Sequence, residues 1–274
     1  MVPDLRPRGV GEILDAAAAL YRSRFGLLVR YAAIIVVPVQ LLLTIVLLSA
    51  QPDHFSVSLN GSASPQFDTS HAQLGATFVV LIVGVLTHAF IVAVTTRVVA
   101  NQYVDNEEAG RALLGKTGRR LLAVLGVGLL VALCEGIGLI FCLVGVLVPL
   151  AFFSAAIPSL LLERRGVGGA LSRSIELTRS HFWHVLGVVL SASLLAGLLN
   201  AALAAGLNIV AVNASTTTIV IAQGITNSIS SMLTTPFVAA ATVALYFDLR
   251  IRNEAFDVQM AIAESASAPA ASKW

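Results

Sequence analysis

Residues 121–162, LLAVLGVGLLVALCEGIGLIFCLVGVLVPLAFFSAAIPSLLL, decide the fold of this chain. The stretch contains one charged side chain, that of Glu135. A helix needs only about 20 apolar residues to cross the ~30 Å of hydrocarbon in a bilayer, so this run is too long for a single span. We therefore expect a transmembrane hairpin that turns near Gly136, Gly138 or Gly145.

Four further apolar runs have the length and composition of membrane-spanning helices. The predicted spans lie at about 26–50, 74–100, 119–138, 140–162, 183–207 and 219–249. A chain that is 57% hydrophobic and 12% charged departs too far from soluble proteins to fold in water. The sequence thus predicts an all-α fold over residues 1–258, a polytopic membrane helix bundle with six transmembrane helices. The Ala- and Ser-rich residues 259–274 are expected to form a disordered cytoplasmic tail.

The basic residues are distributed asymmetrically about these spans. All seventeen Lys and Arg residues lie on one side of the topology, and the loops on the other side carry none. Lys and Arg resist translocation, so both termini are expected in the cytoplasm. Arg outnumbers Lys fifteen to two, which favours a GC-rich bacterial genome and hence the bacterial cytoplasmic membrane. The net charge of +2 is small and gives no indication of a nucleic-acid partner.

The chain also contains an internal repeat. RGVGEILDAAAALYRSRF at 8–25 aligns without gaps to RGVGGALSRSIELTRSHF at 165–182. Both copies have the pattern of an amphipathic helix, predicted at about 10–24 and 168–180, and such helices lie in the headgroup region with the apolar side down. In the second copy the side opposite the apolar stripe carries charged residues, namely Arg173, Glu176 and Arg179. A degenerate third copy at 109–122 gives three units, each an interfacial helix followed by a transmembrane hairpin.

Three segments resemble a known family when taken together. They are GVGEILDAAAALYRSRFGLL at 9–28, ALSRSIELTRSHFW at 170–183 and ALYFDLRIRNEAFDVQM at 244–260. The combination resembles the bacterial membrane-protein family named for the glycerophosphoryl diester phosphodiesterase membrane domain. The resemblance implies a multi-helix membrane region. The catalytic α/β barrel that is fused to some members needs roughly 250 residues, for which this chain has no room, so no catalytic residues carry over.

Four charged or titratable side chains stand out in apolar surroundings. Glu135 is either a functional carboxylate within the membrane or an interfacial acid near the outer end of the third span. Arg97 and Asp248, near the cytoplasmic ends of the second and sixth spans, are expected to pair or to snorkel. Pairing of Asp248 with Arg250 or Arg252 is the alternative. His88 lies mid-membrane, where it could relay protons or, as we favour, form a hydrogen bond between helices.

The fifth and sixth spans are unusually polar because they contain Asn200, Gln223 and Asn227. Polar groups in lipid must find partners, so these side chains are expected to face the bundle interior or a wet cavity. They are candidates for a ligand path, although helix-to-helix hydrogen bonding explains them equally well.

The sequence contains no HExxH, GxSG or GxxxxGK[ST] motif, and we expect no catalytic residues, cofactor or metal site. The favoured hypothesis is a non-enzymatic scaffold or accessory subunit of an envelope or lipid-related system. Its partners would be membrane lipids and a protein at the cytoplasmic face. The first alternative is a transporter or channel for a small molecule or lipid, and the second is a membrane-embedded lipid enzyme.

Overall fold

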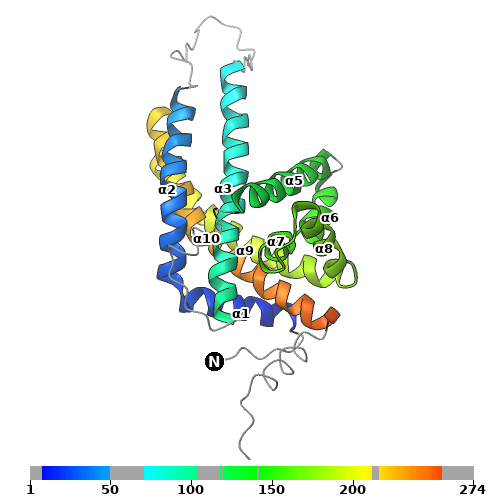
Figure 1. Cartoon of the computed structure of the whole chain (residues 1–274). Helices are drawn as coiled ribbons and strands as arrows, with labels where there is room; N and C mark the ends of the chain where they lie inside the picture. The colour runs from blue at the N-terminus through cyan, green and yellow to red at the C-terminus, as the bar shows by residue number, and fades with distance from the viewer. Residues whose placement is uncertain are drawn as a thin grey trace, which may run out of the picture.

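The computed structural model describes residues 8–49, 71–103, 118, 120–140, 142–211 and 216–254. Within these ranges every regular element is a helix (Figure 1). The helices are α1 Val10–Ser23, α2 Phe25–Ser49, α3 His71–Tyr103, α5 Leu121–Ile140, α6 Cys142–Phe152, α7 Ala156–Leu162, α8 Val167–Arg179, α9 Phe182–Ala211 and α10 Thr216–Glu254.

Six segments are long and apolar enough to cross a membrane, and they confirm the predicted spans. They are Phe25–Ser49, Leu74–Ala100, Leu121–Ile140, Gly145–Leu162, Phe182–Gly206 and Thr217–Glu254. Only 17% of the apolar window in the first of these is buried inside the protein, and side chains such as Leu41 and Ile45 are more than half exposed. Monomeric soluble proteins rarely expose apolar patches of this extent. The chain is therefore a multi-pass integral membrane protein.

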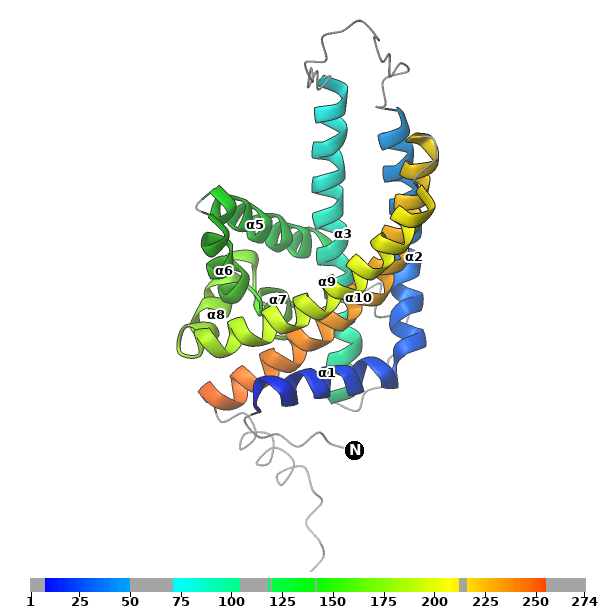
Figure 2. The same ribbon diagram turned by 180° about the vertical axis from the view of Figure 1, so that it is seen from behind.

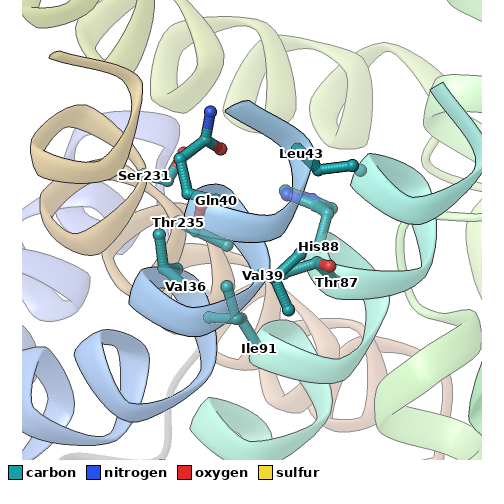
Figure 3. Close-up of a pocket in the computed structure, with 10 residues that line it drawn as sticks. Val36, Val39, Gln40, Leu43, Thr87, His88, Ile91, Ser231 and Thr235 are labelled. Atoms are coloured by element: carbon teal, nitrogen blue, oxygen red, sulfur yellow. The ribbon is translucent and has the colours of Figure 1, made fainter. Parts of the chain in front are cut away.

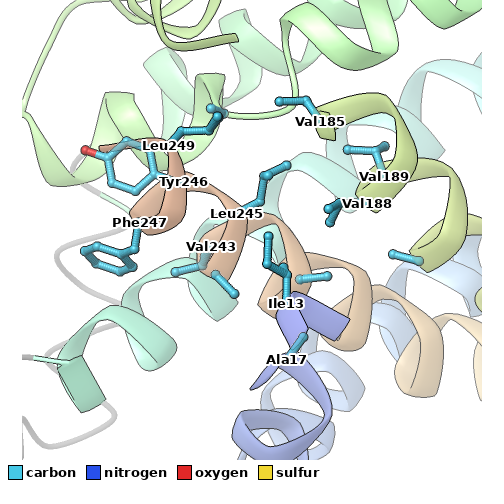
Figure 4. Close-up of a cluster of buried hydrophobic side chains, with 14 of the residues drawn as sticks. Ile13, Ala17, Val185, Val188, Val189, Val243, Leu245, Tyr246, Phe247 and Leu249 are labelled. Atoms are coloured by element: carbon cyan, nitrogen blue, oxygen red, sulfur yellow. The ribbon is translucent and has the colours of Figure 1, made fainter. Parts of the chain in front are cut away.

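The helices form two groups that meet along α3 and α10. In Figures 1 and 2, α2 and α3 stand side by side, and the adjacent pair α9 and α10 crosses them. Helices α5 to α8 make a second group beside α3, and α1 lies across one end of the bundle. The largest buried cluster joins α1, α9 and α10, where Ile13 packs among Val185, Val188 and Leu245 (Figure 4).

The two short helices α1 and α8 occupy nearly the predicted ranges, but their apolar sides do not face lipid. Ile13 and Ala17 of α1 are fully buried against α9 and α10, and Ala170 and Leu177 of α8 are buried in the protein core. The expectation of an apolar side turned toward lipid is wrong for these residues, because the bundle itself offers apolar surface to bury. Their depth relative to the headgroups stays a prediction.

The predicted fourth span, 140–162, is broken into α6 and α7. The break falls at Phe153–Ala155, just before Pro158 in α7. A proline ring clashes with the carbonyl four residues earlier, which here belongs to Ser154, and proline has no N–H to donate to it. By contrast, Pro38 and Pro236 lie within continuous helices.

The predicted hairpin between the third and fourth spans is present. Gly138 of α5 lies so close to Gly145 of α6 that an added Cβ would be 2.5 Å from the Gly145 carbonyl oxygen. Gly128 packs in the same way against Ala89 of α3. Most of the third repeat copy at 109–122 and the whole tail at 259–274 lie outside the described residues, so the threefold repeat and the disordered tail stay predictions.

Candidate functional site

One end of the bundle carries a buried network of charged side chains. We call it the basic end and define it as α1, the α7–α8 turn at 163–166, α8, and the last turns of α10. Asp248 of α10 is 2% exposed and accepts a hydrogen bond from Arg252 Nε at 2.7 Å. The two side chains also hold the backbone of Arg8, since its N–H donates to Asp248 Oδ1 at 2.7 Å and its carbonyl accepts from Arg252 Nη2 at 2.6 Å. His184 Nε2 of α9 lies 3.3 Å from Asp248 Oδ2.

A second part of the network is centred on Glu163, directly after α7. Tyr246 of α10, which is fully buried, donates its hydroxyl to Glu163 Oε1 at 2.9 Å. Arg173 Nε of α8 donates to the same oxygen at 3.1 Å, and Arg165 Nε donates to Glu163 Oε2 at 2.7 Å. Arg173 also pairs with Glu254, near the end of α10. The carboxylate thus ties α7, α8 and α10 together.

The pKa of Glu163 is lowered, because its surroundings favour the ionised carboxylate. Burial alone would raise its pKa, but the hydrogen bonds from Tyr246, Arg173 and Arg165 outweigh burial and hold the pKa below its usual range. A general acid or base works best when its pKa is near the operating pH. The geometry therefore suits Glu163 to a structural role at neutral pH.

Arg120 closes the same end of the second helix group. Its guanidinium donates to the carbonyl oxygens of Leu160 at 3.0 Å, Arg164 at 3.4 Å and Arg165 at 3.5 Å. These carbonyls belong to the end of α7 and the turn that follows, where Arg164 has a left-handed φ of 53°. A cation at the carboxyl end of a helix is favourable because the last carbonyls lack helical partners.

A small polar cavity lies in the membrane-spanning region between α2, α3 and α10. Its volume is about 90 Å³, room for roughly three water molecules. Figure 3 shows Gln40 and Ser231 close to each other and His88 with Thr87 on the opposite side. Thr87 donates to the Val83 carbonyl of its own helix at 2.7 Å. Within the described part of the chain, the other polar lining side chains form no hydrogen bond: Gln40, His88, Ser231 and Thr235.

The amides expected inside the bundle lie elsewhere. Asn200 of α9 and Gln223 and Asn227 of α10 are exposed, and the cavity lining contains none of them. The expectation that they face the interior or a wet cavity is wrong for this single chain. Near the start of α10, the buried residue is instead Gly224, which packs against Thr44 of α2.

The remaining candidates lie on different helices, except that His88 and Arg97 are both in α3. His88 is exposed at the cavity, and no hydrogen bond to another helix is found for it among the described residues. Glu135 is half-buried in α5 and Arg97 is half-buried in α3. Asp248 pairs with Arg252, which was the alternative left open by the sequence. Functional roles for these four residues stay predictions.

Sequence reasoning missed Glu163, Tyr246 and the burial of Arg173. Arg173 was expected on the polar side of its helix, but its side chain is only 9% exposed. A signal existed in the sequence, because Tyr246 and Asp248 belong to the ALYFDLRIRNEAFDVQM segment that carries the family resemblance.

The comparisons with known proteins add no identification. No protein-family model matches the chain, and no curated protein and no solved structure is found to be similar to it. The resemblance to the phosphodiesterase membrane-domain family therefore stays a prediction.

Proposed function

We propose that this chain is a non-enzymatic scaffold or accessory subunit of an envelope or lipid-related system in the bacterial cytoplasmic membrane. The basic end would face the cytoplasm, in keeping with the retention of Lys and Arg on that side. One observation carries the proposal: the network of Glu163, Arg173, Asp248 and Arg252 fixes α1 and α8 against α10.

A surface held this way is organised before a partner arrives. Binding to it requires less ordering of loops and side chains, and this favours affinity. The exposed residues of this surface include Arg22 of α1 and Arg179 of α8, which occupy equivalent positions in the two repeat copies. Their charge suits an acidic surface on a soluble protein, with anionic lipid headgroups as the other source of negative charge.

Charge reversal at these two positions tests the proposal. The double variant Arg22→Glu, Arg179→Glu changes two exposed side chains in the last turns of α1 and α8, so each reversal should cost about 1 kcal/mol through the helix dipole. The matched control is Arg22→Lys, Arg179→Lys, which keeps both charges. After gentle detergent purification from the native membrane, wild type and control should carry the same soluble protein in stoichiometric amount, and the Glu variant should lose it.

Two results would defeat the scaffold proposal. One is a wild-type chain that elutes without a protein partner, whether or not it retains anionic lipid. The other is a Glu variant that retains the partner as well as the Lys control does.

The polar cavity supports a second candidate function, the passage of a small neutral solute. Its lining has hydrogen-bonding groups from three helices but no Asp, Glu, Lys or Arg. Vesicles containing the protein would be tested with water, urea and glycerol by stopped-flow light scattering. Permeability above that of protein-free vesicles, reduced by Thr235→Val, would support this candidate. Permeability equal to that of protein-free vesicles would end it.

A further inference from the structure

Three amide side chains are exposed within the membrane-spanning parts of α9 and α10. Asn200 lies in the span Phe182–Gly206, and Gln223 and Asn227 lie in the span Thr217–Glu254. Helix α9 forms the near face of the bundle in Figure 2, with α10 running beside it. In an isolated chain these amides would therefore contact lipid.

The depth of the amides follows from two features. Gly224 lies against Thr44 of α2, because a Cβ on Gly224 would be 2.4 Å from Thr44 Oγ1. Thr44 precedes the end of α2 at Ser49 by more than one helical turn, roughly 7 Å at 1.5 Å per residue. Gln223 and Asn227 lie within three residues of Gly224 in sequence, and so within about 5 Å of this level along α10 at 1.5 Å per residue.

Asn200 reaches a similar depth on the neighbouring helix. It precedes the end of α9 at Ala211 by as many residues as Asn227 follows the start of α10 at Thr216. Because α9 and α10 are adjacent and follow one another in the chain, Asn200 and Asn227 lie at comparable distances from the end of α9 and the start of α10.

An amide in hydrocarbon is unfavourable unless its donors and acceptor are paired. Hydroxyl side chains of α10 form hydrogen bonds within their own helix: Ser228 donates to the Gly224 carbonyl and Thr234 donates to the Ser230 carbonyl. For the Asn200, Gln223 and Asn227 side chains, the described residues provide no hydrogen bond. Among the described residues, these three amides therefore lack the partners that hydrocarbon surroundings require.

We propose that the amide face, defined as Asn200, Gln223 and Asn227, binds a second copy of this chain within the membrane. An amide carries both a donor and an acceptor, so it can pair with another amide. Two copies inserted in the same orientation and related by a twofold axis along the membrane normal bring identical amides together at identical depth. Gly197 and Ala201 beside Asn200 are exposed and small, which allows close helix approach.

Association in lipid tests this proposal. The full chain would be labelled with donor and acceptor dyes at an exposed site of α1, Gly11→Cys, after replacement of Cys134 and Cys142 by Ala. Energy transfer in lipid vesicles should persist as the lipid-to-protein ratio rises. In the variant Asn200→Leu, Gln223→Leu, Asn227→Leu the association constant should fall about tenfold or more. The control Ile221→Ala, Ile225→Ala, Ile229→Ala alters exposed apolar residues of α10 and should associate as the wild type does.

Thermal unfolding of the leucine variant provides the second measurement. Because the three positions are exposed, the variant should unfold no more easily than the wild type at a still higher lipid-to-protein ratio, at which energy transfer between the copies is lost. A strongly destabilised leucine variant would overturn the proposal, since the amides would then have partners within the chain. So would a wild type that is monomeric at every ratio, or a leucine variant that associates as strongly as the wild type.

Discussion

The contact between α5 and α6 yields a sharp prediction for Gly138→Ala. The new Cβ would lie 2.5 Å from the carbonyl oxygen of Gly145, 2.8 Å from its carbonyl carbon and 3.1 Å from Cα of Val146. All three are backbone atoms, so no side-chain rotation can relieve the overlap. The two helices must separate by about 1 Å to restore ordinary contact, and overpacking of this kind typically costs about 1–3 kcal/mol.

Gly136→Ala in the same helix is the matched control. Gly136 is exposed, and a Cβ there would meet nothing within 4 Å. Ala is favoured over Gly in a helix interior by up to about 1 kcal/mol, a gain available to both variants. We therefore expect Gly138→Ala to be less stable than Gly136→Ala by about 1–3 kcal/mol, measured by reversible denaturant unfolding in mixed micelles. Equal stabilities would refute the close α5–α6 packing on which the reasoning rests.

Three further predictions concern the basic end. Tyr246→Phe should lower the free energy of unfolding by about 1.5–3 kcal/mol, because it removes the hydrogen bond that a fully buried tyrosine donates to a charged carboxylate. No change in the same micelle titration would contradict that bond. The pKa of Glu163 is lowered in the folded chain, so ionised Glu163 stabilises the fold fully above the ordinary glutamate pKa, and this stabilisation is lost as pH falls through the lowered value. Unfolding titrations between about pH 6 and about pH 3 should show this loss of stability in the wild type but not in Glu163→Gln. Asp248→Asn should weaken the hydrogen bonds to the backbone of Arg8 and speed amide hydrogen exchange at the start of α1. Unchanged exchange there would show that these hydrogen bonds do not hold the start of α1.

Apolar length and the internal sequence repeat made much of the fold predictable. The spans and the two short helices follow from runs of apolar residues and from the repeated RGVG segments at 8–25 and 165–182. Apolar length did not predict the division of the fourth span into two helices, because that division depends on how the Ser154 carbonyl is accommodated before Pro158 in three dimensions.

The site was less predictable because its partners are far apart in sequence. Glu163 meets Tyr246 over a sequence separation of 83 residues, and Arg8 meets Asp248 over one of 240. Helical periodicity could not distinguish a buried Arg173 from an exposed one, since both lie on a polar stripe. The prediction that Asn227 faces the bundle interior was wrong for another reason. A polar side chain in a membrane requires a hydrogen-bond partner, but that partner need not belong to the same chain.

The most direct test of the scaffold account is site-specific photocrosslinking in living cells of the native host. A photoreactive residue would replace Arg22 or Arg179 at the basic end, with Ile45 on the exposed apolar side of α2 as the control position. The account predicts one discrete soluble protein crosslinked from both Arg positions and absent from Ile45. Adducts to lipid alone at all three positions would contradict it.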